Sequence, residues 1–177
     1  MKNIKEQKNK SKECELLLFH STTKKNLQGI MKEGIRPGMK GGWCDQWDKK
    51  LESEHSSKEE LEREKKFIDE YRKECQEYIF FSTDFHSLEH EMPEESDIII
   101  IVCLPKKMVI IPSRKLGRYV PFEEWEEIRS SVKEDYRQVL VKEIISPHYI
   151  IGCLDVFERE WLSDLGKTRF RINKMIS

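Results

Sequence analysis

The stretch Asp97 to Leu104, DIIIIVCL, constrains the fold more than any other part of the chain. Its residues after Asp97 are all apolar, and most of them are β-branched. An uninterrupted run of this kind indicates a strand that is buried on both faces, so it belongs at the centre of a sheet. Lys106 and Lys107 then separate it from Met108 to Ile111, which the spacing predicts as its hairpin partner. Shorter apolar runs predict further strands at 16–19, 78–82, 138–141 and 149–153.

The stretch Glu15 to Gly38 combines a strand, a polar corner and a helix. Its apolar strand ends abruptly in the polar residues 20–23, His-Ser-Thr-Thr. Thr22 or Thr23 can cap the helix that follows, and Gly34 ends that helix before Pro37.

A brief helix is predicted from Thr83 through Leu88, and three longer helices each have a local signal. Ser57 to Gln76 begins with the spacing of a capping box and carries a thin apolar stripe on a charged helix. Pro121 opens a second helix with acidic residues in its first turn. The last runs from about Val156 to Leu165 and ends at Gly166. Because the strands alternate only irregularly with the helices, the sequence predicts an α+β fold, a compact mixed or antiparallel sheet with flanking helices.

The length of 177 residues predicts one domain, which we place at 14–156. Residues 1–13 are predicted to be a flexible basic leader, 44–77 a charged helical insertion, and 157–177 a C-terminal helix and tail. The chain has 32 Lys and Arg against 33 Asp and Glu, a net charge of -1, so no global field draws it to nucleic acid or to a membrane.

Neither the cysteines nor the histidines form a recognisable metal site. The five cysteines are widely spaced and include no C-x-x-C pair, which predicts that most of them are reduced core or surface thiols. His86 and His90 have helical spacing, but no third ligand accompanies them, so we predict no metal. The chain also has no apolar signal segment and no membrane-length apolar run, which predicts a soluble cytoplasmic protein. The cysteines are Cys14, Cys44, Cys75, Cys103 and Cys153.

Three short motifs, taken in order, resemble those of the ADP-ribosyltransferase superfamily. The strand that ends in His20-Ser21-Thr22 is similar to the "His-Gly-Thr" opening of that family. The stretch Tyr78 to Asp84 resembles its second element, an aromatic strand followed by a small polar residue. Gln138 to Val141, which leads to Ile145-Ser-Pro, is similar to the third. The resemblance covers about 16–156 and implies a split sheet that binds NAD as a co-substrate in the cleft between its two halves.

The resemblance also implies roles for individual residues. His20 matches the histidine that hydrogen-bonds the adenosine ribose, and Thr22 would support the same edge of the cofactor. Ser21 replaces the usual glycine, whose backbone pairs with the nicotinamide amide. Phe80 stands where related enzymes often have a tyrosine, and Ser82 could supply a polar contact nearby.

Gln138 stands where the family has its catalytic glutamate. An amide can hydrogen-bond a ribose hydroxyl, but it offers no charge to an oxocarbenium-like transition state. Glu143 or Glu134 could supply the carboxylate in a different register. Otherwise the protein is a slow transferase that uses groups of the acceptor, or it binds NAD or ADP-ribose without chemistry.

The resemblance therefore implies an NAD-dependent ADP-ribosyltransferase that acts on a macromolecular acceptor, a protein or a nucleic acid, and releases nicotinamide. The alternative is a non-catalytic module that binds NAD, ADP-ribose or a partner. The related RNA 2'-phosphotransferase chemistry is a third candidate, but Arg114 and Arg118 are the only clustered arginines before the third motif that could line its phosphate site. Trp43 and Trp47 could stack on a single-stranded acceptor.

Overall fold

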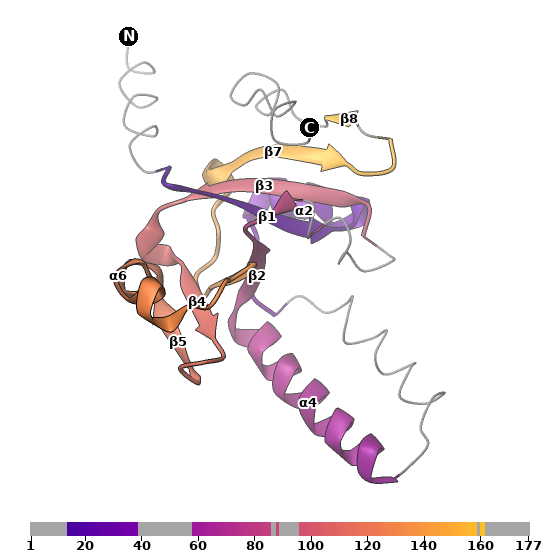
Figure 1. The fold of residues 1–177 in the computed structure, drawn as a ribbon. Helices are drawn as coiled ribbons and strands as arrows, with labels where there is room; N and C mark the ends of the chain where they lie inside the picture. The colour runs from indigo at the N-terminus through magenta and orange to yellow at the C-terminus, as the bar shows by residue number, and fades with distance from the viewer. Residues whose placement is uncertain (1–13, 39–57, 86–87, 89–95, 159, 162–177) are drawn as a thin grey trace.

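The structure, a computed structural model, describes residues 14–38, 58–85, 88, 96–158 and 160–161. Within these residues eight strands form one sheet, in the order β5-β4-β6-β2-β1-β3-β7-β8, and every pairing is antiparallel (Figure 1). The predicted α+β class is confirmed. The strands are β1 (Leu16–Thr22), β2 (Ile79–Ser82), β3 (Ile98–Leu104), β4 (Ile110–Ser113), β5 (Arg118–Pro121), β6 (Gln138–Val141), β7 (Ile150–Asp155) and β8 (Glu160–Trp161).

The central strand is β3, as its apolar run predicts. It pairs with β1 on one side and with β7 on the other. Alternate residues of a strand point to opposite faces. Accordingly, Ile98 and Ile100 lie in the larger core cluster, whereas Ile99 and Ile101 lie in a second cluster on the other face. Every residue of β3 is buried, which is why the sequence shows no alternation there.

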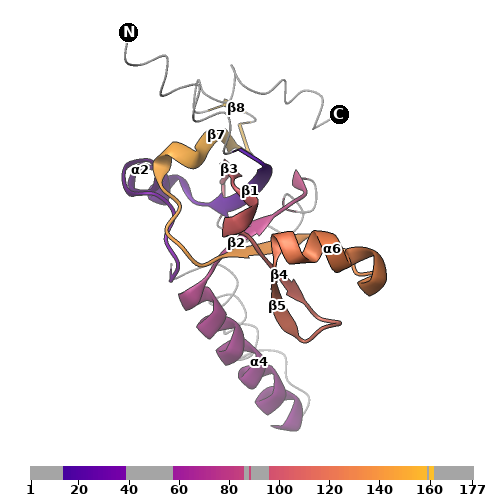
Figure 2. The same ribbon diagram turned by 90° about the vertical axis from the view of Figure 1, so that its left-hand side faces the viewer.

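The sheet consists of two half-sheets that meet at one paired position. One half contains β1, β3, β7 and β8, and the other contains β2, β6, β4 and β5. Between β1 and β2 the only paired residues are Phe19 and Ser82. We call this paired position and the residues next to it the β1–β2 join. In Figure 2 the half-sheet with β1, β3 and β7 lies above the join, and the half-sheet with β2, β4 and β5 lies below it.

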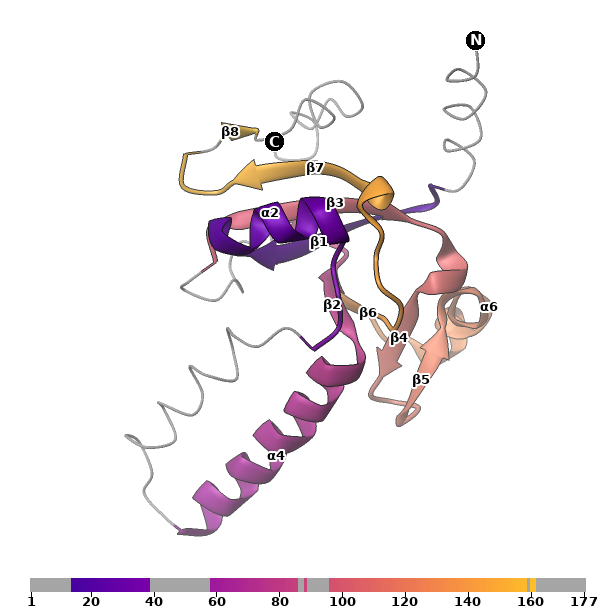
Figure 3. The same ribbon diagram turned by 180° about the vertical axis from the view of Figure 1, so that it is seen from behind.

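Two helices bury side chains in the larger core cluster. The first, α2 (Lys24–Glu33), contributes Ile30 and lies beside β1 and β3 (Figure 3). The second, α6 (Phe122–Val132), contributes Phe122 and Trp125. Both begin where the sequence predicts, with Thr23 and Pro121 at their N-caps, and α2 ends at Gly34 as predicted. The helix α4 (Lys58–Glu77) matches the predicted charged helix and extends away from the sheet (Figure 1).

The C-terminal part of α4 is attached to the second half-sheet by aromatic and polar contacts. The rings of Tyr71 and Phe80 lie 5.3 Å apart. The Tyr119 hydroxyl of β5 donates a hydrogen bond to Glu74, and burial together with this carboxylate raises the pKa of Tyr119. By contrast, the side chain of Phe67, nearer the N-terminal end of α4, is 55% exposed.

Several sequence predictions about local structure are wrong. The residues after β3 form a short 3-10 helix, η1 (Lys106–Met108), and β4 pairs with β5 and β6 rather than with β3. Because η1 turns the chain out of the β3 plane, no hairpin forms there. A turn at 156–158 leads to β8 instead of a helix, and β8 extends the sheet beside β7.

Two of the described cysteines are joined in a disulfide. Cys14 and Cys103 form a disulfide, whereas Cys75 and the buried Cys153 are thiols outside it. The partners are 89 residues apart in sequence, so their spacing carries no signal of the pairing.

Other predictions lie outside the described residues: the leader 1–13, the tail after 161, and Cys44, Trp43, Trp47, His86 and His90. Among the described residues, no group of three or more His, Cys, Asp or Glu side chains is placed to hold a metal ion. No helix in the described part of the chain has the length and the apolar character to cross a membrane.

Candidate functional site

The β1–β2 join brings three of the predicted site strands into one row. Phe19 of β1 is opposite Ser82 of β2, and Ser82 is in turn opposite Gln138 of β6. Neighbouring strands lie about 4.8 Å apart, so Gln138 is within roughly 10 Å of β1. Gln138 is exposed at the first position of its strand. The chain therefore places the residues of its three motifs side by side, although they are far apart in sequence.

His20 reaches across the join. Its Nδ1 atom lies 2.9 Å from the Phe80 carbonyl oxygen, and its ring centroid lies 5.4 Å from that of Phe81. A carbonyl only accepts hydrogen bonds, so Nδ1 carries the proton and donates it. Burial lowers the pKa of His20, and the hydrogen bond to Phe80 opposes this in part. The ring is therefore neutral at pH 7, with Nε2 as a hydrogen-bond acceptor.

Strand alternation separates His20 from the other two residues of the site. Ser82 and Gln138 are direct partners, so their side chains leave the sheet on the same face. His20 follows Phe19, the partner of Ser82, and its side chain leaves β1 on the other face. The hydrogen bond from the His20 ring to Phe80 thus adds a side-chain contact between the half-sheets beside the paired residues Phe19 and Ser82.

The remaining predicted cofactor contacts are largely engaged by the protein itself. Ser82 donates its hydroxyl to the Asp84 carbonyl at 2.8 Å, and the same hydroxyl lies 3.3 Å from the carbonyl of Arg137. Thr22 is 6% exposed, and its carbonyl accepts the Asp97 amide at 3.1 Å. Ser21 and Phe80 are half-buried.

The backbone just before Gln138 is held in place by β2. The amide of Thr83 donates to the Arg137 carbonyl at 2.9 Å, next to the hydroxyl of Ser82. Tyr136 packs edge-on against Trp125 of α6, with ring centroids 5.8 Å apart. These contacts come from two separate elements, so they define where β6 begins and where Gln138 lies.

Neither alternative carboxylate lies at the join. Glu143 is exposed beyond the far end of β6, and roughly 3.3 Å per residue puts it about 16 Å from Gln138. Glu134 accepts hydrogen bonds from the Ser113 hydroxyl at 2.6 Å and the Arg114 amide at 2.9 Å. These bonds, that to Ser113 above all, lower the pKa of Glu134. It therefore caps the turn between β4 and β5.

The sequence gives no signal for a charged network beside the polar corner. Asp155, the last residue of β7, is 1% exposed, and its carboxylate lies 2.5 Å from the Lys24 Nζ atom. It also accepts the amides of Phe157 and Glu158 at 3.1 and 3.0 Å. Asp97 accepts the Lys24 amide at 2.6 Å and so caps α2 in place of Thr22 or Thr23. The network fixes the start of α2 directly after the polar corner.

Replacing Asp155 with asparagine is expected to lower the thermal midpoint at pH 7 by several degrees, because the Lys24 ammonium loses its buried partner. The hydrogen bond from Lys24, followed by the backbone bonds, lowers the pKa of Asp155. The stabilisation is therefore complete above the ordinary carboxyl pKa of about 4 and is lost as the pH falls through the lowered value.

Melting curves of both proteins between neutral and acidic pH measure this effect. The difference should shrink on acidification, and a difference that grows in acid would contradict the assignment. Glu33→Gln is the matched control, because Glu33 and its partner Arg36 are exposed and such pairs contribute little.

The comparisons with known proteins leave the family open. No family model matches the chain, and no curated protein matches it. Among solved structures, the chain is similar to EcPltA, with 9% sequence identity and a TM-score of 0.39 over 82% of this chain and 80% of that one. At this TM-score the likeness carries no argument about the fold or the function.

Proposed function

We propose that this chain binds NAD at the β1–β2 join and transfers its ADP-ribosyl group slowly to a macromolecular acceptor, with release of nicotinamide. The observation that carries the proposal is the row formed by Phe19, Ser82 and Gln138, with His20 next to it on β1 and the His20 side chain on the opposite face of the sheet. The three motifs that resemble ADP-ribosyltransferases thus occupy adjacent strands, at the position where the two half-sheets part.

In this proposal the neutral His20 accepts a hydrogen bond from a ribose hydroxyl through Nε2, because Nδ1 is already bonded to Phe80. Phe80 offers a half-buried ring for stacking on a flat heterocycle. Gln138 hydrogen-bonds the ribose next to nicotinamide. Without a carboxylate at that point, the cationic sugar receives little electrostatic stabilisation, so turnover is slow.

The binding step can be tested by titrating the protein with NAD in a calorimeter. We expect His20→Asn to weaken binding about ten-fold, because the loss of one acceptor costs about 1.4 kcal/mol at the upper end of the usual range. His148→Asn is the matched control, since His148 is exposed and bonded to Ser146 in a separate part of the fold. Equal affinities of the two variants would contradict the role given to His20.

The chemical step is tested with NAD labelled in the adenosine part, incubated with cell lysate and then separated into protein and nucleic-acid fractions. The proposal expects label in one fraction and free nicotinamide in proportion. If NAD neither binds nor is cleaved, the proposal is wrong.

A second candidate is a module that binds NAD or ADP-ribose without chemistry. Two observations favour it: Gln138 is uncharged, and strand alternation puts its side chain on the face opposite to that of His20. Glu134 and Glu143 do not compensate, since one caps a turn and the other lies at the far end of β6. This candidate expects measurable affinity for NAD or ADP-ribose with no label transferred and no nicotinamide released.

A further inference from the structure

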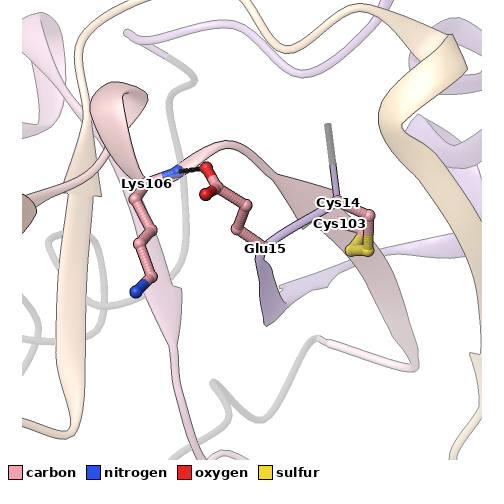
Figure 4. Close-up of a disulfide and its surroundings, with 4 residues drawn as sticks. All are labelled: Cys14, Glu15, Cys103 and Lys106. Atoms are coloured by element: carbon pink, nitrogen blue, oxygen red, sulfur yellow. Dashed lines mark hydrogen bonds between the residues drawn. A yellow bond between two sulfur atoms is a disulfide. The ribbon is translucent and has the colours of Figure 1, made fainter. Parts of the chain in front are cut away.

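The disulfide between Cys14 and Cys103 joins two very different environments (Figure 4). The two Cα atoms are 5.1 Å apart, a normal separation for a disulfide. Cys14 immediately precedes Glu15 and is exposed, whereas Cys103 of β3 is 5% exposed. Cys103 belongs to the second core cluster, together with Phe19 and Ile101. The disulfide therefore joins an exposed residue to a residue of the apolar interior.

This asymmetry decides where a thiol can attack. Thiol–disulfide exchange proceeds when a thiolate approaches one sulfur in line with the S–S bond and expels the other, so access to the attacked sulfur controls the rate. In-line attack on Cys14 comes from the exposed side. Attack on Cys103 would require the thiolate to approach through the packed side chains of the second cluster.

We propose that Cys14 is a site of thiol–disulfide exchange, at which a small thiol of the glutathione class becomes bonded to Cys14 and Cys103 is released. In the step, the thiolate of the small molecule forms a bond to the Cys14 sulfur while the Cys14–Cys103 bond breaks. The electron pair of the broken bond leaves with the sulfur of Cys103, which then takes up a proton from solvent. A second small thiol can then attack the sulfur of the small molecule that is bonded to Cys14. This step releases a disulfide made of the two small molecules and leaves Cys14 as a thiol.

The same environment makes the exchange slow and reversible. A leaving thiolate that is expelled into apolar surroundings is disfavoured, which slows its departure. The released Cys103 also stays close to the mixed disulfide and can re-form the original bond. The two other described cysteines, Cys75 and Cys153, are not part of the disulfide. Burial raises the pKa of Cys153 to about 11, so it is a poor competing nucleophile.

Exchange at Cys14 loosens a defined set of contacts. The amide of Glu15 donates to the Leu104 carbonyl at 3.2 Å, and its carboxylate accepts the Lys106 amide at 2.9 Å (Figure 4). The ammonium of Lys106 pairs with Glu126 of α6 at 2.7 Å. The disulfide therefore holds Glu15 where it caps η1. The pairing of β1 with β3 does not depend on the disulfide, because it runs the whole length of both strands.

The test uses the full chain, incubated with reduced glutathione and then alkylated, with the adducts located by peptide mass mapping. The proposal expects glutathione on Cys14 and none on Cys103, with Cys103 alkylated only after denaturation. Glutathione on Cys103 would overturn it. So would alkylation of both cysteines in the native protein before any reductant is added, because no disulfide would then be present.

Two variants give an independent measurement of access. Cys103→Ala leaves Cys14 as a free thiol, and Cys14→Ala leaves Cys103. With a chromogenic disulfide reagent, Cys14 is expected to react at least about ten-fold faster than Cys103 in the folded proteins. Cys44→Ala and Cys75→Ala in both backgrounds remove two further thiols of the chain from the signal. Equal rates would overturn the proposal, and if either variant fails to fold, the peptide map of the unmodified chain decides.

Discussion

A glutamate in place of Gln138 is expected to raise the rate of NAD cleavage by about 100-fold or more. Position 138 is exposed at the start of β6 and lies opposite Ser82, so a longer-range rearrangement is not needed to bring a carboxylate to the join. The added charge stabilises a cationic sugar as it forms, whereas the amide of glutamine does not. Release of nicotinamide from NAD, with and without an acceptor, measures the effect.

The matched control is Glu143→Gln, which should leave the rate unchanged because Glu143 lies beyond the far end of β6. A large loss in that variant would show that Glu143 supplies the catalytic charge and that Gln138 does not mark the site. If Gln138→Glu binds NAD but cleaves it no faster, the non-catalytic candidate is favoured. If neither protein binds NAD, the join is not a nicotinamide dinucleotide site.

Gly34→Ala is expected to destabilise the fold by about 3 kcal/mol or more. Gly34 ends α2 with φ 91° and ψ 179°, a backbone conformation that is essentially restricted to glycine. A Cβ atom there would also meet the Ile145 carbonyl oxygen, which accepts the Ile35 amide at 2.9 Å. Relieving this overlap would displace the bridge that connects the end of α2 to the chain after β6. Denaturant unfolding measures the loss.

Gly29→Ala is the matched control, because Gly29 lies inside α2 and a Cβ atom there meets nothing within 4 Å. Alanine favours a helix interior over glycine, so this variant should gain about 0.5–1 kcal/mol. The two substitutions add the same methyl group to the same helix, and only the backbone conformation and the neighbours differ. Equal effects would contradict the account of Gly34.

Local patterns in the sequence were sufficient for most elements of the fold. The unbroken apolar run of β3 indicates a central strand. The structure confirms it, because successive residues of β3 alternate between the two core clusters. The C-terminal end of α2 and the start of α6 follow from Gly34 and Pro121, because these effects act within one helical turn, whereas the cap of α2 comes from the distant Asp97. The two-residue strand β8 was missed because so short an element has too little pattern of its own.

For the candidate site, too, one part could be predicted from the sequence and another part could not. The motifs around His20, Phe80 and Gln138 could be found in the sequence, and the structure places them on neighbouring strands. The sequence could not show that Glu134 caps a turn or that Glu143 lies at the other end of β6. Those assignments depend on how strands pair, which short-range spacing does not record.

What the sequence determined about this protein is most of its helices and strands, though not β5 or β8, because hydrophobic periodicity and capping act among residues that are close in the chain. Only the tertiary structure decided which elements meet: the single pairing of Phe19 with Ser82, the burial of Asp155 against Lys24, and the disulfide of Cys14 with Cys103. These contacts join residues that are far apart in sequence. They form because the sheet must bury β3 on both faces, and the packing that achieves this brings their partners together.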